Sequence, residues 1–401
     1  MKYWRGYLIA AILGAISWAL LELAKKYTKL VDMVYPYITR TVQGFLSVWS
    51  SGTSLLLWQV ALVVLVLALV TSIVLLILFR WNPIQWGGWV VAVVALVYFM
   101  HTCVYGLNYH AGPLAEDVRL EVTEYTLLEL EEATIYFRNQ ANALATEMPR
   151  DSKGNLDFSD FDTLAKQAGT GFEVLTYEQS YSVFAGDLTP VKKLGFSGMY
   201  SSMGITGITI PITGEAAVNP EIPDVTLPFT MCHEMAHRMC IAVERDANFA
   251  GFLACRANPD PQFQYSAYYM AFRYCYNALA SVGSPEAAAA AARIYSGVNP
   301  ELERDLQTYD KFFEDKKDDS ATELADTVND TYIKTSGDEA GISSYGQVCD
   351  LLVSWHLQEI VAPAQKEEAT STFDPYDEEQ VDLEGIVGAM KGENDDAADA
   401  E

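Results

Sequence analysis

The chain has 401 residues, 50% of them hydrophobic, and a formal net charge of −27. The charge is uneven, because the first 110 residues contain seven Lys and Arg against two acidic residues, whereas the remainder contains nineteen against fifty-one. Such an acidic excess makes nucleic acid and anionic lipid headgroups poor partners for the C-terminal part. We therefore expect no nucleic-acid partner, and an N-terminal part that is unlike the rest of the chain.

The N-terminal part is expected to be a membrane anchor of three transmembrane helices. Residues 55–79 and 87–107 are uncharged runs long enough to cross a bilayer. Residues 6–24 are also apolar and follow Lys2 and Arg5, as in a signal peptide, but no small-residue cleavage site follows, which favours an uncleaved span. Basic residues are divided almost equally between the two sides of this anchor, and a slight excess on the side of the C-terminal domain weakly favours a cytoplasmic domain.

After the anchor, the apolar spacing predicts one long helix over residues 114–148 and a second over 158–167 that ends at Gly169. Residues 204–212 alternate toward a short strand or hairpin, and Pro211 favours an edge position. An edge strand just ahead of a zinc-binding helix would let an extended peptide add to it through backbone hydrogen bonds. A plain surface hairpin is an equally good interpretation of this segment.

The most informative segment is the His-Glu-Met-Ala-His motif at residues 233–237. Two histidines four positions apart share one face of a helix, so His233 and His237 can bind one zinc ion (Zn²⁺), and Glu234 is placed as the general base of metalloproteases. A catalytic zinc site needs a third protein ligand and one open position. Glu244, at the start of the next predicted helix, is the best candidate, and Asn248 one turn further on could hydrogen-bond a ligand. The alternative is a polar helix face, with Glu244 an ordinary first-turn acid.

Cysteines and tyrosines near the motif offer weaker candidates. Cys232 and Cys240 flank it, but the cysteines outside the spans lack paired spacing and are expected to be small buried residues rather than ligands. The helix predicted over residues 264–282 is rich in tyrosine, and one hydroxyl there could donate to a developing oxyanion. The tyrosines are Tyr265, Tyr268, Tyr269, Tyr274 and Tyr276.

Further helices are predicted along the rest of the chain. They follow helix periodicity and helix-start signals and cover residues 226–240, 243–256, 285–296, 301–316, 321–332 and 345–361. From residue 363 onward the composition is acidic without apolar periodicity, which predicts a disordered tail.

Several stretches also carry a family resemblance. They are Gly-Ile-Thr-Gly at 204–207, Gly-Glu-Ala-Ala-Val-Asn at 214–219, Leu-Pro-Phe-Thr at 227–230 ahead of the motif, Asp-Ala-Asn-Phe at 246–249, and two later segments at 328–334 and 344–352. With the three preceding spans they resemble a bacterial domain-of-unknown-function family, number 3810, of membrane-anchored zincins. The resemblance implies His233, His237 and Glu244 as zinc ligands with Glu234 as base, and an outward-facing catalytic domain. This chain departs from it at Cys240, where relatives commonly have glycine.

Together these features predict a mainly α-helical protein. Residues 1–110 would form the anchor, residues 111–362 a zincin-like metallopeptidase domain with a small edge sheet, and residues 363–401 the tail. The expected activity is zinc-dependent hydrolysis of a peptide or protein substrate near the membrane. The expected location is the bacterial cell membrane, with the catalytic domain extracytoplasmic as the resemblance implies. A rival function is that of a non-catalytic, zinc-stabilised membrane sensor or scaffold.

Overall fold

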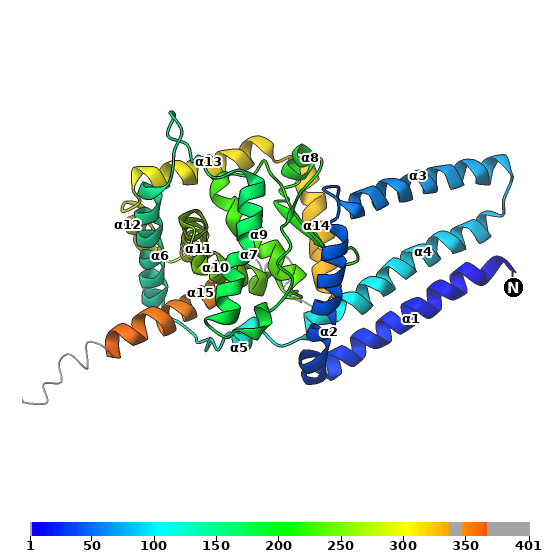
Figure 1. Cartoon of the computed structure of the whole chain (residues 1–401), viewed down its shortest axis with the longest axis horizontal. Helices are drawn as coiled ribbons and strands as arrows, with labels where there is room; N and C mark the ends of the chain where they lie inside the picture. The colour runs from blue at the N-terminus through cyan, green and yellow to red at the C-terminus, as the bar shows by residue number, and fades with distance from the viewer. Residues whose placement is uncertain (1, 337–346, 367–401) are drawn as a thin grey trace, which may run out of the picture. The chain divides into compact units, whose positions relative to one another are not determined.

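Helices make up most of the computed structural model, which describes residues 2–336 and 347–366 (Figure 1). The structure is 74% helical and has one small three-stranded sheet, so the predicted mainly α-helical class is confirmed. The described residues up to Trp355 belong to one compact unit, and those from His356 onward belong to a second.

Three helices of the described chain are long and apolar enough to cross a membrane, as predicted: α1 (Arg5–Lys26), α3 (Leu57–Leu78) and α4 (Pro83–Val104). A single turn, η1 (Lys2–Trp4), precedes α1. Helices α1 and α4 pack along each other, and a β-carbon on Gly6 would overlap the backbone of Gly88. Glycine at this crossing therefore permits the close backbone approach typical of helix pairs in membranes.

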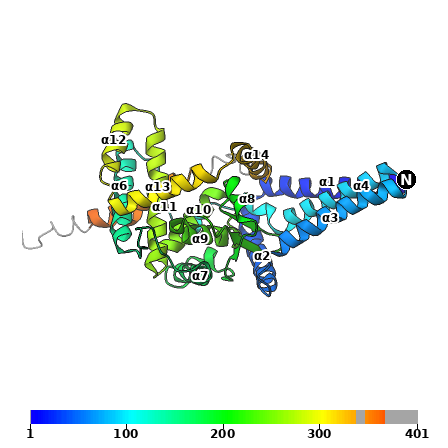
Figure 2. The same ribbon diagram turned by 90° about the horizontal axis from the view of Figure 1, so that it is seen from above.

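A fourth N-terminal helix, α2 (Thr28–Ser50), was not predicted. It follows α1 almost directly and precedes α3, and it crosses the ends of the three apolar helices where they meet the rest of the unit (Figures 1 and 2). After α4 the chain makes the turn η2 (Gly106–His110), which contacts α2.

The single helix predicted over residues 114–148 is wrong. The structure has a short α5 (Leu114–Asp117) and a separate α6 (Leu127–Glu147), joined by non-helical backbone with Arg119 at a positive φ of 57°. Helix α6 starts at a capping box, in which Thr126 and Glu129 each satisfy a backbone N–H of the other. A capping box is a sequence signal for the start of a helix. It lies within the region that the apolar spacing alone predicts as one helix.

The next helix, α7 (Phe161–Tyr177), extends beyond its predicted end at Gly169. The glycines of α7 serve packing rather than termination. A β-carbon on Gly171 would overlap the carbonyl of Ala254 in α10, so glycine lets the two helices cross closely.

The sheet has the strand order β1-β3-β2. Strands β1 (Lys192–Lys193) and β3 (Glu215–Val218), neither of which was predicted, pair in parallel. Strand β2 (Gly207–Ile210), within the predicted segment, pairs antiparallel with β3. The predicted edge position of the 204–212 segment is thus confirmed. The short helical segments around the sheet are η3 (Ser182–Phe184), α8 (Ser197–Ser202) and η4 (Asp224–Thr226).

The remaining predicted helices are present with small boundary shifts: α9 (Leu227–Arg238), α10 (Glu244–Ala257), α11 (Pro261–Ser281), α12 (Pro285–Tyr295), α13 (Pro300–Lys316) and α14 (Asp319–Ser336). Three of them, α11, α12 and α13, start with proline after a side-chain cap, a typical helix start. The helix predicted over 345–361 is described as α15 (Val348–His356) followed by a π-helical turn, η6 (Leu357–Val361). Residues 345–346 and most of the predicted tail, residues 367–401, lie outside the described part.

An aromatic core fixes α10 within the unit. Phe252 of α10 packs edge-on against Phe137 of α6 and Trp355 of α15, with ring centroids 5.8 and 5.1 Å away. Phe137 is fully buried, and α6 and α11 pack along each other beside it. Burial of such large rings strongly favours one position of α10, and with it one position of Glu244 at its first turn.

Candidate metal centre

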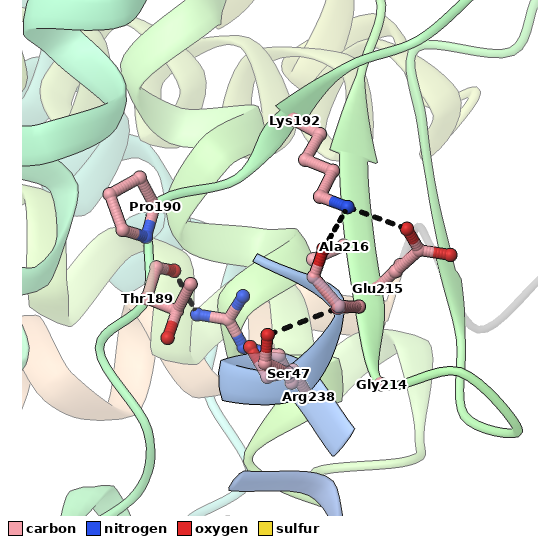
Figure 3. A pocket seen from close by; sticks show the side chains of 9 residues that line it. Ser47, Thr189, Pro190, Lys192, Gly214, Glu215, Ala216 and Arg238 are labelled. Atoms are coloured by element: carbon pink, nitrogen blue, oxygen red, sulfur yellow. Dashed lines mark hydrogen bonds and ion pairs between the residues drawn. The ribbon is translucent and has the colours of Figure 1, made fainter. Parts of the chain in front are cut away.

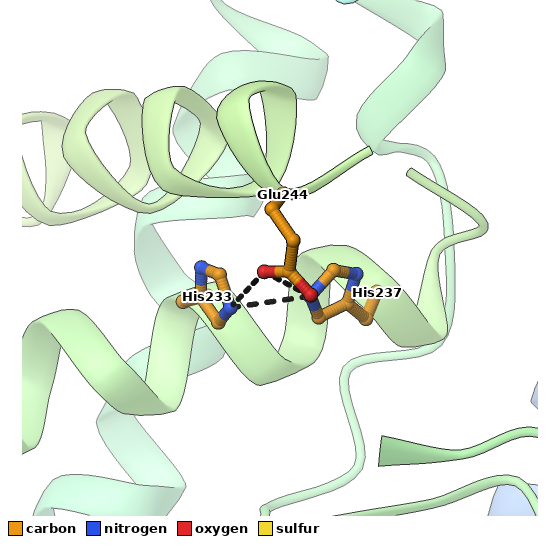
Figure 4. Close-up of side chains that lie close together, drawn as sticks. All are labelled: His233, His237 and Glu244. Carbon is orange, nitrogen blue, oxygen red and sulfur yellow. Dashed lines mark hydrogen bonds and ion pairs between the residues drawn. The ribbon is translucent and has the colours of Figure 1, made fainter. Parts of the chain in front are cut away.

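Helix α9 carries the His-Glu-Met-Ala-His motif, and all of its residues are buried. Helices α7, α10 and α11 and strands β2 and β3 pack around it. Because His233 and His237 are four positions apart, their rings project from the same side, toward α10 (Figure 4). They are only 9% and 8% exposed, so the packing of α9 fixes the rings rather than leaving them to solvent.

The turn between α9 and α10 brings the third ligand candidate back to the histidines. Ile241 N–H donates to the carbonyl of Ala236, and Cys240 N–H donates to that of His237. These are the two hydrogen bonds of a Schellman motif, in which the residue after the C-cap is left-handed and usually glycine. Cys240 takes that conformation, with φ of 71°, so the turn forms although the expected glycine is absent. Glu244 follows as the first residue of α10.

The structure brings the three predicted ligands together (Figure 4). His233 Nε2 lies 3.1 Å from His237 Nε2, and Glu244 Oε2 lies 3.4 Å from the first and 3.3 Å from the second. Within the described part of the chain, these three residues are the one group of His, Cys, Asp and Glu side chains with ligand atoms this close. Neither Cys232 nor Cys240 belongs to it.

Hydrogen bonding assigns the tautomer of one histidine. His237 Nδ1 lies 2.9 Å from the carbonyl oxygen of Ile241, which can only accept, so Nδ1 carries the proton. In the neutral ring, Nε2 then presents a lone pair toward His233 and Glu244. A metal-binding imidazole is usually oriented in this way, because its second ring N–H donates to a backbone carbonyl or a carboxylate.

Burial and charge shift the pKa values of the cluster in opposite directions. Burial lowers the pKa of His237, but the charge and hydrogen bond of Glu244, together with Glu234 and the Ile241 carbonyl, outweigh it and raise that pKa to about 9. Burial raises the pKa of Glu244, but the charges and hydrogen bonds of His237 and His233 outweigh it and hold that pKa well below its usual range. Without a metal, His237 is therefore in its cationic form near neutral pH, with protons on both ring nitrogens.

Glu234 lies on another side of α9, against the edge strand. Thr209 of β2 donates from Oγ1 to Glu234 Oε2 at 2.7 Å, and a β-carbon on Gly207 would overlap Glu234 Oε1. Burial raises the pKa of Glu234 despite the two nearby histidines and the Thr209 hydrogen bond. A buried carboxylate with a raised pKa is a stronger base than a solvated one.

Sequence reasoning missed Gly207 and Thr209. The signal was present, because residues two apart on a strand point to the same face and the 204–212 segment was predicted to be extended. What the sequence lacked was the identity of the side chain that this face would meet.

Asn248 and Tyr274 form a pair beside the cluster. Tyr274 donates its hydroxyl to Asn248 Oδ1 at 3.2 Å, so this oxygen of Asn248 bonds to tyrosine rather than to a ligand candidate. Burial raises the pKa of Tyr274, and Tyr309 and the charge of Glu244 add to that effect. Tyr265 and Tyr269 instead donate to Asp305. Among the predicted tyrosines of α11, Tyr274 is thus the one that hydrogen-bonds to a predicted site residue, Asn248.

The fold and the site define a class: a helical protein with three potential membrane spans and a buried His-His-Glu cluster. The chain belongs to the family described as Protein of unknown function (DUF3810), which matches residues 31–353. No curated protein and no solved structure matches the chain.

Proposed function

We propose that this protein is a membrane-anchored, zinc-dependent metallopeptidase of the zincin type. The observation that carries the proposal is the triangle of His233 Nε2, His237 Nε2 and Glu244 Oε2, with sides of 3.1 to 3.4 Å. An ion about 2.0–2.1 Å from each ligand in tetrahedral geometry separates the ligand atoms by about 3.3 Å. The triangle therefore has the size that bound zinc requires, and two imidazoles with one carboxylate suit zinc chemically.

The number of ligands supports catalysis over a purely structural role. A structural zinc site is closed by four protein ligands, whereas a catalytic one has three and an open position. The cluster has three members within the described residues, and each of their side chains keeps 11% of its surface exposed. This residual exposure supports access for water and substrate, and it disfavours the sensor or scaffold alternative.

The chain's own residues supply the remaining chemistry. Zinc, when bound, would polarise the scissile carbonyl and make water more acidic. Glu234, oriented by Thr209, would accept the proton and deliver it to the leaving amine. Strand β2 pairs with β3 along one edge, and within the described residues no strand pairs with its other edge. An extended peptide could add there, directly beside Glu234.

The test compares the full chain with Glu234→Gln after zinc loading, using a peptide library and mass spectrometry. Loss of the general base is expected to reduce turnover by about 10²–10⁴-fold with zinc content unchanged. Glu129→Gln is the control, because the Glu129 carboxylate caps the start of α6 and a glutamine side chain can keep that cap. The proposal fails if zinc-loaded protein cleaves no peptide, or if Glu234→Gln cleaves as fast as the unaltered chain.

Location is a separate part of the proposal. The family resemblance favours the bacterial cell membrane with the metal-site domain extracytoplasmic. A reporter that is active on one side of the membrane only, fused after residue 401, tests the orientation. Reporter activity restricted to the cytoplasm would reject an extracytoplasmic site without affecting the proposed chemistry.

A further inference from the structure

Helix α2 exposes an apolar face. Eight large apolar residues on it are 44 to 72% exposed, and they recur at intervals of one, three, four and seven residues, which places them along one side of the helix. They are Leu30, Met33, Val34, Tyr37, Ile38, Phe45, Val48 and Trp49. We call this face the outer stripe. The charged residues of α2, which are Lys29, Asp32 and Arg40, lie off the stripe. Thr41, exposed and uncharged, lies on the same side between Ile38 and Phe45, so the stripe is apolar apart from this hydroxyl and is uncharged throughout. An exposed apolar face of this kind marks an interaction surface.

The opposite face of α2 is polar and bonded to the rest of the unit. Gln43, fully buried, donates to the carbonyl of Pro211 just after β2 at 2.9 Å. Arg40 donates to the carbonyl of Met239, in the turn between α9 and α10, at 3.3 Å. This helix therefore reverses the usual pattern of a soluble protein, in which the apolar face is buried and the polar face exposed.

Both ends of α2 are tied to helices that can cross a membrane. Its first residue, Thr28, is separated from the end of α1 by Tyr27 alone. Near the same end, Tyr35 donates to the carbonyls of Thr102 and Cys103, in the last turn of α4, at 3.0 Å each.

The far end of α2 is held at the start of α3. Glu215 of β3 accepts from the backbone N–H groups of Leu57 and Trp58, the first residues of α3, at 2.8 and 3.0 Å. Lys192 of β1 donates to Glu215 (Figure 3). Lys192 also donates to the carbonyl of Ser50, the last residue of α2. Since α1 and α4 end, and α3 begins, on the same side of the membrane, both ends of α2 lie at one membrane surface.

We propose that α2 is an interfacial helix whose outer stripe lies in the boundary between the lipid headgroups and acyl chains. Its 23 residues extend roughly 34 Å along the surface at 1.5 Å per residue. The uncharged stripe, with Tyr37 and Trp49 in it, has the composition that binds this boundary. The structure favours lipid as the partner of the outer stripe, because α2 is joined to three apolar helices that would themselves lie in lipid.

The test measures immersion depth in the full chain reconstituted into phosphatidylcholine vesicles. Cys103 is replaced by alanine, since the other native cysteines are buried, and a nitroxide is attached at Met33→Cys, Phe45→Cys or Val48→Cys, one at a time. Leu65→Cys in α3 serves as the bilayer reference. Tyr177→Cys, at a residue 81% exposed at the end of α7, serves as the aqueous reference. Collision rates with oxygen and with a water-soluble nickel complex are compared by power saturation.

All three stripe positions are expected to show a higher oxygen-to-nickel collision ratio than Tyr177→Cys and a lower one than Leu65→Cys, with similar depths at Met33 and Val48. A water-like ratio at either end of the stripe overturns the proposal. Dipolar broadening that disappears on dilution with unlabelled chain, together with low access to both reagents, also overturns it, because a second copy would then cover the stripe. Since three sites are labelled separately, misfolding of one variant leaves two that decide the outcome.

Discussion

Cys240 shows how one residue can carry the strain of a functional turn. It adopts the left-handed conformation in the Schellman motif that leads from His237 to Glu244. Left-handed backbone costs about 1–2 kcal/mol for a residue with a β-carbon, and glycine avoids this cost. We expect Cys240→Gly to be more stable than Cys240→Ala by about 1 kcal/mol, since both lose the thiol and only glycine removes the strain. Chemical denaturation of both variants in the same detergent measures the difference, and equal stability would contradict the assigned conformation.

Gly207 leaves the space that Glu234 occupies. A methyl group at this position would overlap Glu234 Oε1, so Gly207→Ala must displace either the carboxylate or β2. We expect turnover to fall about 100-fold, the effect of a misplacement of about 1 Å, while zinc content stays unchanged. Gly198→Ala in α8 is the matched control, because no atom lies within 4 Å of its added carbon. Peptide cleavage and metal analysis of both variants give the comparison, and equal turnover in both variants would count against the role of Glu234.

The raised pKa of His237 predicts opposite pH effects with and without zinc. Without metal, the folded state holds this proton more tightly than the unfolded state. The resulting stability is therefore fully present below about pH 6.5 and is lost as pH rises through about 9. Zinc must displace the same proton, so its binding strengthens as pH rises over this range. Zinc is expected to raise Tm more at pH 8.5 than at pH 6.5. A zinc effect that does not change with pH would argue against His237 as a ligand, and His237→Gln should abolish the pH dependence.

Among the elements, a buried polar joint connects the sheet to the start of α3. Lys192 and Glu215 pair at 2.7 Å with side chains 12% and 0% exposed, and Glu215 also caps α3. Removing one partner of a buried pair typically costs about 3–5 kcal/mol. We expect Glu215→Gln to lower the free energy of unfolding by roughly this amount. Asp162→Asn breaks the exposed pair with Lys193 and should cost less than about 1 kcal/mol. Similar losses in the two variants would show that the joint adds nothing beyond a surface pair.

Prediction from sequence succeeded where a local pattern determines the element. Uncharged runs were sufficient for α3 and α4, and alternation with Pro211 was sufficient for the edge position of β2. The spacing of His233 and His237 was sufficient to place both histidines on one side of a helix, because that placement depends on helix geometry alone. Only the return of Glu244 across the turn needed tertiary structure.

Prediction failed where partners distant in sequence decide the structure. The helical pattern of α2 was in the sequence, but its polar face is bonded to Met239 and Pro211, which no local pattern links to it. The contact of Glu234 with Gly207 and Thr209 was missed for the same reason, since it depends on β2 packing against α9. The break ahead of α6 was missed because apolar spacing was considered without the Thr126 and Glu129 capping box.

At the scale of the whole molecule, the end of α4 packs against the residues that directly precede Glu244. Tyr105 and Tyr109 form a buried apolar cluster with Ala242, and Val104 and Val243 pack against it. Val104 is the last residue of α4, and Val243 directly precedes Glu244. The distance between the candidate metal site and the end of a candidate membrane span is thus fixed by packing rather than by a flexible linker.

For the proposed peptidase activity, this fixed distance means that the concentration of a substrate near the membrane determines how readily it is cleaved. A peptide anchored in the same membrane is confined to a thin layer that contains the site, so its effective concentration there far exceeds its bulk value. We expect an acylated peptide to be cleaved at a much lower bulk concentration than the same peptide without its acyl chain in vesicles, and the difference to vanish in excess detergent micelles. Equal dependence on concentration in vesicles would show that the site acts on soluble peptides as readily as on anchored ones.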